Sequence, residues 1–177
     1  MYFITCTVNK RVAIFTRKIY TDTIVESLNY CVDNKGLIIY RYVIISNHVH
    51  LIVQAKDENL SDIIRDFKKF TSQTIIRTIE VSKNESRKDW MLWLLKETDE
   101  DKKISYRFWK PDNHPELCYG LPFMWQKLEY IHNNPVKAGW VYKAEDYVYS
   151  SAADYTHGKQ VGKIKVSLLN AIQTTYS

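Results

Sequence analysis

Cysteine is scarce in this sequence. Only 3 of the 177 residues are cysteines, namely Cys6, Cys31 and Cys118. They are widely spaced and include no Cys-x-x-Cys pair, so the sequence predicts neither a disulfide framework nor a zinc knuckle. Cysteines used in this way are typical of a reducing compartment. We therefore expect a cytoplasmic protein.

Long apolar runs are absent as well. No stretch reaches the roughly 18 apolar residues of a membrane-spanning helix, and residues 1–5 have neither the basic nor the long apolar region of a secretory signal. Internal repeats and low-complexity tracts are also missing. The sequence thus predicts a soluble, unexported protein without a membrane partner, and its length suits one domain with terminal additions.

Acidic residues are fewer than basic ones, with 20 Asp and Glu against 25 Lys and Arg, a formal net charge of +5 and a pI near 9.0. This excess mildly favours a polyanionic partner. Aromatic residues make up 14% of the chain, with 13 Tyr and 5 Trp. Planar side chains among basic ones suit unpaired bases, although most aromatic residues of any domain are simply core.

Hydrophobic periodicity predicts strands and helices in a definite order. The expected elements are a strand over 2–8, a helix capped by Thr21 or Thr23 and running towards Gly36, strands over 37–45 and 48–54 joined as a hairpin by Ser46-Asn47, a helix from the N-cap Ser61, a short helix around 90–95, a strand over 106–109 and a helix over 123–133. Strand, helix, hairpin, helix, strand is the split arrangement of ferredoxin-like folds. We predict an α+β, ferredoxin-like βαββαβ sandwich whose antiparallel sheet has the hairpin strands at its centre, with an added C-terminal helix.

The helix after Ser61 has two different faces. Its apolar positions at helical spacing are Leu60, Ile63, Ile64, Phe67, Phe70 and Thr74. The opposite face carries Arg65 and Lys69, with Lys68 at its margin. Such a face is often merely solvated, and the sequence leaves that interpretation open beside one in which it contacts nucleic-acid phosphates.

The segment Asn47-His48-Val49-His50 opens the second strand of the predicted hairpin. Because side chains alternate along a strand, His48 and His50 lie on one side, roughly 6.6 Å apart along the backbone. That spacing suits one metal ion, while Val49 and the residues in phase with it point into the core. A histidine pair also occurs as ordinary surface or core residues, and the pair alone leaves both interpretations open.

The helix over 123–133 has a polar face as well as an apolar one. Gln126, Tyr130 and Asn134 follow one another at four-residue intervals on the polar face. Pro135 disfavours α conformation at Asn134, so we expect the helix to end there and leave the Asn134 carboxamide near a frayed end. Spacing alone does not separate a chemical role for Tyr130 and Asn134 from a structural one.

Four segments then occur together in one order. They are Ser46-Asn47-His48-Val49-His50-Leu51-Ile52-Val53, Phe108-Trp109-Lys110, Tyr130-Ile131-His132-Asn133-Asn134-Pro135-Val136-Lys137-Ala138-Gly139 and Asp146-Tyr147-Val148-Tyr149-Ser150-Ser151-Ala152. In this combination they resemble the REP-associated tyrosine transposases, members of the HUH single-strand transposases and nucleases. The resemblance covers residues 1–156 and departs at Ser46, where many members carry proline, and over 83–103, which looks like extra length.

The resemblance implies a HUH transposase-like catalytic domain over residues 1–156 and a C-terminal tail over 157–177. It implies that His48 and His50 hold Mg²⁺ or Mn²⁺, with Asn134 as a further ligand. It also implies that Tyr130 attacks a phosphodiester of single-stranded or hairpin DNA, leaving a 5′-phosphotyrosine and a free 3′-OH, as in DNA transposition and recombination. We expect a monomer or a homodimer.

Several basic residues are candidates for phosphate contacts in such an enzyme. They are Arg65, Lys68, Lys69, Arg107, Lys110 and Lys127. Two other functions compete with a metal-dependent endonuclease and strand transferase. One is a catalytically silent DNA-binding module of the same fold, and the other is a metal hydrolase that uses water, which would need a carboxylate base near the histidines where the sequence has none adjacent.

Overall fold

An antiparallel sheet lies at the centre of the computed structural model, which describes residues 1–57, 59–98, 104–118 and 121–169. Its strand order is β2-β3-β1-β6. The strands are β1 (Tyr2–Thr7), β2 (Leu37–Ile45), β3 (His48–Ala55) and β6 (Glu116–Leu117). With every neighbouring pair antiparallel, this is the order of a ferredoxin-like βαββαβ fold, as predicted.

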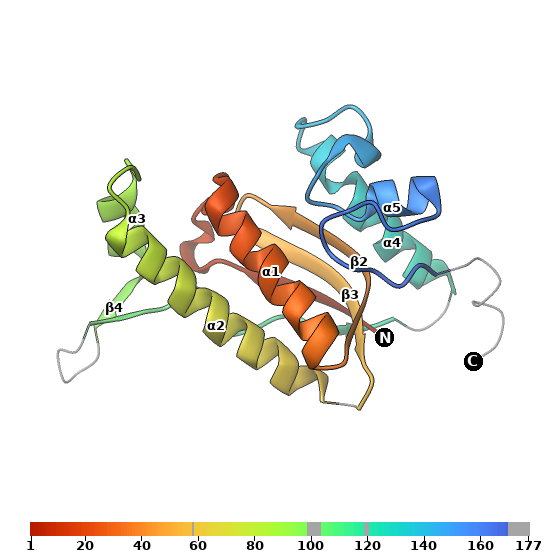
Figure 1. Cartoon of the computed structure of the whole chain (residues 1–177), viewed down its shortest axis with the longest axis horizontal. Coiled ribbons are helices and arrows are strands. Elements are labelled where there is room, and N and C mark those ends of the chain that lie inside the picture. Colours follow the sequence, from red (N-terminus) through yellow and green to blue (C-terminus); the bar gives the residue numbers. More distant parts are fainter. Residues whose placement is uncertain (58, 99–103, 119–120, 170–177) are drawn as a thin grey trace.

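Helices surround the sheet and a small hairpin extends from it. The elements are the 3₁₀ helices η1 (Asn9–Arg11) and η2 (Ala144–Asp146), the α-helices α1 (Lys18–Asn34), α2 (Leu60–Val81), α3 (Lys88–Leu95), α4 (Leu121–Lys137) and α5 (Ala152–His157), and the strands β4 (Lys96–Thr98) and β5 (Ile104–Tyr106). In Figure 1, α1 and α2 run side by side, α3 and β4 lie at one end of the molecule, and α4 and α5 lie at the other.

Both faces of the sheet are buried. Ile4 and Leu51 belong to the main core beneath α1 and α2, whereas the adjacent residues Phe3 and Ile52 belong to a second, smaller core. Leu128 of α4 packs into this second core, as does its neighbour on the same helix, Ile131. The alternation along the strands thus gives three layers, and α4 is the added helix that covers the second face.

The predicted hairpin is confirmed, because Ile45 pairs with His48 across the two-residue link. Of the two hairpin strands, however, β3 is interior and β2 is an edge strand. The prediction that both hairpin strands lie at the centre of the sheet is therefore wrong for β2. Later parts of the chain cover its edge: the backbone amide of Ile44 donates to the Tyr149 carbonyl at 2.9 Å, and that of Ser167 donates to the Ile39 carbonyl at 2.8 Å. The open edge is thereby closed by backbone hydrogen bonds.

The fourth strand lies further along the chain than predicted. Tyr106 ends β5, which pairs with β4 in a separate two-stranded sheet. Trp109 makes a single bridge to Val8, and β6 pairs with the start of β1. The edge beside β1 is built in pieces because residues 108–117 contain Pro111 and Pro115, which lack the amide that a ladder needs.

Helix starts also differ from the predictions. The first helix begins at Lys18, and the hydroxyls of Thr21 and Thr23 donate to helix carbonyls instead of capping. The second begins at Leu60 rather than after Ser61. No side-chain cap forms at either helix, so tertiary packing sets these boundaries.

Helix α4 continues past the point where it was expected to stop. Pro135 lies inside the helix and is buried, and the Ala138 amide still donates to the Asn134 carbonyl at 3.0 Å. A proline removes only its own backbone amide donor from the helix. Burial of the Pro135 ring against the neighbouring structure outweighs the tendency of a proline to keep the residue before it, Asn134, out of α conformation. The helix ends at Lys137, before Gly139 with its positive φ of 73°.

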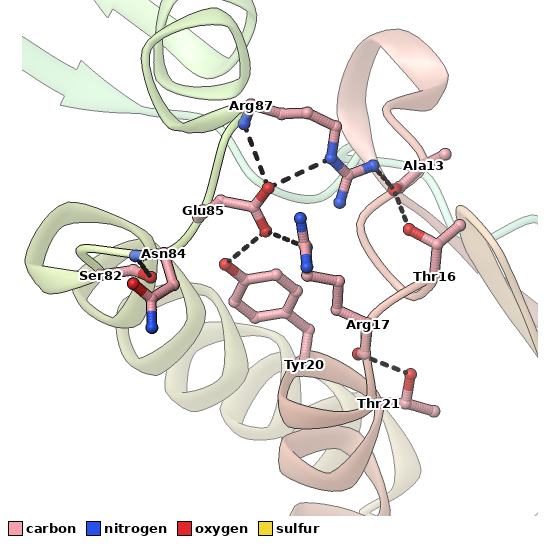
Figure 2. A network of polar contacts seen from close by, with 9 residues as sticks. All are labelled: Ala13, Thr16, Arg17, Tyr20, Thr21, Ser82, Asn84, Glu85 and Arg87. Atoms are coloured by element: carbon pink, nitrogen blue, oxygen red, sulfur yellow. Dashed lines mark hydrogen bonds and ion pairs between the residues drawn. The ribbon is translucent and has the colours of Figure 1, made fainter.

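The link between α2 and α3 is fixed by a buried carboxylate (Figure 2). Glu85 Oε2 accepts from the Tyr20 hydroxyl at 3.1 Å and lies 2.7 Å from Arg17 Nε, while Oε1 accepts from Arg87 Nε at 3.2 Å. Arg87 in turn donates to the Ala13 carbonyl at 3.0 Å. Burial raises the pKa of Glu85, but the hydrogen bonds and charge of Arg87 outweigh it and lower the pKa overall. The start of α3 is therefore fastened to the segment before α1.

Two further findings concern the chain as a whole. No helix among the described residues is both long and apolar enough to cross a bilayer. Beyond residue 156 the chain still packs on the domain, since Ile164 is fully buried and Asp154 accepts from the Val161 amide at 2.6 Å. The division into a domain over 1–156 and a tail over 157–177 stays a prediction.

Candidate functional site

The two histidines lie side by side at the start of β3. Their ring centroids are 4.6 Å apart at an interplanar angle of 73°. His50 is opposite Thr5 of β1 and His48 is opposite Thr7, so both side chains share one face of the sheet. A polar platform would leave this face open to solvent. In the structure α4 covers it instead, and His50 is only 5% exposed.

Hydrogen bonds fix how each imidazole is oriented. Asn47 Nδ2 donates to the Arg11 carbonyl at 3.0 Å, which turns Asn47 Oδ1 towards His48 Nδ1, 2.7 Å away. His48 Nδ1 therefore carries the proton, and the lone pair of Nε2 is available. Thr5 Oγ1 lies 2.8 Å from His50 Nδ1. The other ring nitrogen of His50, Nε2, is buried without a hydrogen-bond partner.

Both imidazoles are held in the neutral form. Burial lowers the pKa of His50 to about 3, with smaller contributions from His48 and Lys127. Burial also lowers the pKa of His48, with a further contribution from the charge of Arg11. Neutral imidazole is the form that binds a metal ion, and a metal-binding histidine usually donates a hydrogen bond to the protein through its other nitrogen.

Tyr130 reaches the same place from α4. Its ring centroid is 5.2 Å from that of His50 and 6.3 Å from that of Phe3, and the residue is 40% exposed. Leu128 and Ile131 are buried on the other side of the helix, as predicted. The structure thus brings together the tyrosine and the histidine pair, which are 80 residues apart in sequence (130 against 50).

These groups line a pocket of about 340 Å³ whose residues are Phe3, Thr5, His50, Glu116, Gln126, Lys127 and Tyr130. Sequence reasoning missed Phe3, Thr5 and Glu116. Glu116 comes from β6, opposite Phe3, so a carboxylate that is distant from the histidines in sequence lines the same pocket as His50. It is paired with Lys127 Nζ at 2.9 Å. Alternation along the first strand would have placed Phe3 and Thr5 on the histidine face, but nothing in the sequence locates Glu116.

The donor set suits a divalent metal ion in part. An unpartnered buried imidazole nitrogen beside a second imidazole with a free lone pair is what a metal would satisfy. Among the described residues, no group of three or more His, Cys, Asp or Glu is placed to hold a metal ion. The pair would need a further ligand of another type. Asn134 follows Tyr130 by one helical turn, and in the described chain its carboxamide has no hydrogen-bond partner.

The predicted DNA contacts fall into different settings. Lys127 lines the pocket and lies 4.4 Å above the Phe3 ring. Lys68 donates to the Lys110 carbonyl at 2.6 Å and to Asn113 Oδ1 at 2.7 Å, which ties α2 to the edge segment. The remaining candidates are Arg65, paired with Asp62, Arg107, paired with Glu97, Lys69, which is exposed on α2, and the half-buried Lys110.

Comparison with known proteins defines the class to which this fold and site belong. A family model described as "Transposase IS200 like" matches residues 1–95, which is more than half of the chain. The protein belongs to the IS200-like transposase family. The matched region contains the histidine pair and ends before Tyr130, so the tyrosine assignment rests on the chain's own motif and on the geometry above.

A solved structure supports the same conclusion about the fold. The structure of a REP-associated tyrosine transposase bound to a REP hairpin is similar to this chain with a TM-score of 0.58 and 19% identity. The similarity covers 96% of this chain and 87% of that chain. The resemblance inferred from the motifs is therefore confirmed. No curated protein matches the chain.

Proposed function

We propose that this protein is a metal-dependent single-stranded DNA endonuclease and strand transferase that acts through a 5′-phosphotyrosine on Tyr130. One observation carries the proposal: the ring of an exposed tyrosine lies 5.2 Å from that of a buried histidine whose Nε2 has no partner, in a single pocket. Membership of a transposase family supports DNA as the substrate.

The histidines and the tyrosine have separate tasks in this reaction. His48 and His50 would hold Mg²⁺ or Mn²⁺ through their Nε2 atoms, with Asn134 as a further ligand. When bound, the ion supplies Lewis-acid polarisation of the scissile phosphate. The protein's part is to hold the imidazoles neutral and to fix their orientation through Asn47 and Thr5.

The covalent step exchanges one phosphodiester for another. The Tyr130 hydroxyl gives up its proton as its oxygen forms a bond to phosphorus, the bond from phosphorus to the 3′ oxygen breaks, and that oxygen takes up a proton to become a 3′-OH. A tyrosine hydroxyl is a weak nucleophile at neutral pH, so the site must activate it, and positive charge near the phosphate assists the attack. Lys137 Nζ lies 5.9 Å from the Tyr130 ring centroid, and Lys127 lines the same pocket. The ester formed retains the bond energy, which allows rejoining.

Hairpin DNA with a single-stranded flank is the proposed substrate. The similar structure, that of a REP-associated tyrosine transposase, is bound to a REP hairpin, and this chain has an excess of basic residues. We propose a cytoplasmic protein that works as a monomer or a homodimer.

The test uses labelled hairpin DNA with single-stranded flanks, incubated with the protein and Mg²⁺ or Mn²⁺. A labelled adduct that survives denaturant, and that disappears when a chelator is added, supports the proposal. Binding without adduct under all metal conditions would instead assign the protein to the catalytically silent module. Cleavage without adduct would favour hydrolysis by water, for which Glu116, the acidic residue of the pocket lining, is the candidate base.

A further inference from the structure

A second hollow lies where η1 meets α3. It has a volume of about 600 Å³ and is lined by Lys10, Trp93, Leu94 and Lys96. Among the described residues, its lining contains two cations and no acidic side chain. Within the residues that the structure describes, neither the Lys10 nor the Lys96 side chain has an ion-pair or hydrogen-bond partner. The hollow is therefore positively charged, with an aromatic side chain in its wall.

Trp93 is not a core residue. It is 71% exposed, whereas Met91 and Leu95 on the same helix are fully buried. Together with the partly buried Leu92 and Leu94 they pack α3 on the main core, to which Trp93 does not belong. A large exposed indole between lysines suits stacking with a base, because every base presents a π-face.

The segment η1 connects the hollow to the residue before His48, because Lys10 lines the hollow and the next residue, Arg11, is hydrogen-bonded to Asn47. Lys10 and Arg11 both have positive φ, 53° and 55°, so this segment is held in an uncommon conformation. The Arg11 carbonyl accepts from Asn47, and Asn47 orients His48. This segment thus contacts both the residue that orients His48 and the wall of the hollow.

The helix that carries Trp93 is firmly attached. The Glu85 network of Figure 2 ties the start of α3 to Arg17 and, through Arg87, to the Ala13 carbonyl. Since η1 and residue 13 belong to the same connection, both walls of the hollow are anchored to one another.

We infer that η1 and α3 form a subsite for single-stranded DNA, separate from the catalytic pocket, in which Trp93 stacks on a base and Lys10 and Lys96 contact phosphates. The inference rests on the proposed function for its substrate class. It assigns a role to a segment that the catalytic chemistry does not use. Binding there is tolerant of sequence, because stacking and phosphate contacts read no base edges.

The test compares Trp93→Ala with Trp90→Ala, its matched control. Trp90 is on the same helix and is 51% exposed, but it does not line the hollow. The probes are a DNA hairpin with oligothymidylate flanks on both sides and the same hairpin without flanks, both measured in chelator so that no cleavage occurs. Trp93→Ala should weaken binding of the flanked hairpin fivefold or more, as about 1 kcal/mol or more per stacked base implies, and leave the bare hairpin unaffected.

Trp93→Phe keeps an aromatic face and should restore most of the affinity. Tryptophan fluorescence of the wild type should be quenched by the flanked hairpin more than that of Trp93→Phe. Equal affinities for Trp93→Ala and Trp90→Ala, or equal losses for flanked and bare hairpins, would overturn the subsite.

The lysines are tested by salt dependence. Lys10→Gln and Lys96→Gln should each reduce the slope of log K against log salt by about 0.7, while Lys83→Gln, an exposed lysine outside the hollow, should leave it unchanged. An unchanged slope in both hollow variants contradicts the phosphate contacts.

These outcomes separate the subsite from the proposed function. Adduct formation at Tyr130 with no effect of Trp93→Ala would refute the subsite alone. A flank-dependent effect of Trp93→Ala without any adduct would refute the endonuclease and keep the subsite. No binding of either probe by the wild type would refute both.

Discussion

His132, on α4, makes folding stability depend on pH. Its Nδ1 lies 3.2 Å from Arg41 Nη1 and its Nε2 lies 2.9 Å from Ser151 Oγ. The guanidinium can only donate, so Nδ1 accepts and Nε2 carries the proton of a neutral ring. Burial lowers the pKa of His132 to about 3, and the charge of Arg41 contributes further. The folded protein therefore resists protonation of this ring.

The sign and size of this pH dependence follow from the linkage between protonation and folding. An unfolded histidine takes up a proton near pH 6.5, so the stability due to the neutral ring is complete above that pH and is lost as pH falls from 6.5 towards 3. Between pH 7.5 and pH 5.0 one such histidine costs about 2 kcal/mol of unfolding free energy. His50, whose pKa is also lowered to about 3, acts in the same direction.

The assay is urea denaturation at pH 7.5 and 5.0 in the presence of a chelator. His132→Gln should lose about 2 kcal/mol less than the wild type over this interval, because His50 remains in both proteins. His157→Gln, at an exposed position, is the control and should lose as much as the wild type. A His132→Gln variant with the wild-type pH dependence would refute the buried neutral ring.

Three other predictions concern the site and its support. His48→Ala and His50→Ala should abolish adduct formation in gel assays, and the loss of stability should be larger for His50→Ala because that ring is buried against Phe3; a metal-stimulated adduct in either variant would contradict their role as ligands. Asn134→Ala should raise the Mn²⁺ concentration needed for half-maximal adduct formation without eliminating the product, and an unchanged metal titration would remove it from the ligand set. Glu85→Ala should lower the unfolding free energy by about 1–3 kcal/mol in urea titrations, since it leaves the buried Tyr20 hydroxyl without its acceptor and the partly exposed Arg17 and Arg87 without their partner, and an unchanged free energy would show that the network adds little.

Local patterns predicted the parts of the structure that depend on neighbouring residues. The alternation of β3 placed His48 and His50 on one face, and the spacing on α4 put Tyr130 opposite the buried Leu128. Both follow from backbone periodicity, which tertiary contacts do not change. The hairpin was equally predictable from the sequence, because a two-residue link between two apolar runs fixes its register.

Features set by distant contacts were not predictable in this way. Glu116 enters the pocket because β6 pairs with the start of β1, and a two-residue strand has no periodicity to recognise. Pro135 stays helical because its burial is decided by packing. The cover of α4 over the histidine face is likewise a tertiary result. It turned an expected open platform into a pocket with one orphaned imidazole nitrogen.

The central claim is that Tyr130 forms the covalent link to DNA, and peptide mapping of the adduct tests it directly. We expect a nucleotide-modified peptide that contains Tyr130, and no adduct from Tyr130→Phe, which keeps the ring and should still bind hairpin DNA. Tyr142→Phe, at a 99% exposed tyrosine, should form the adduct like the wild type. An adduct retained by Tyr130→Phe, or a modified peptide elsewhere in the chain, would contradict the mechanism.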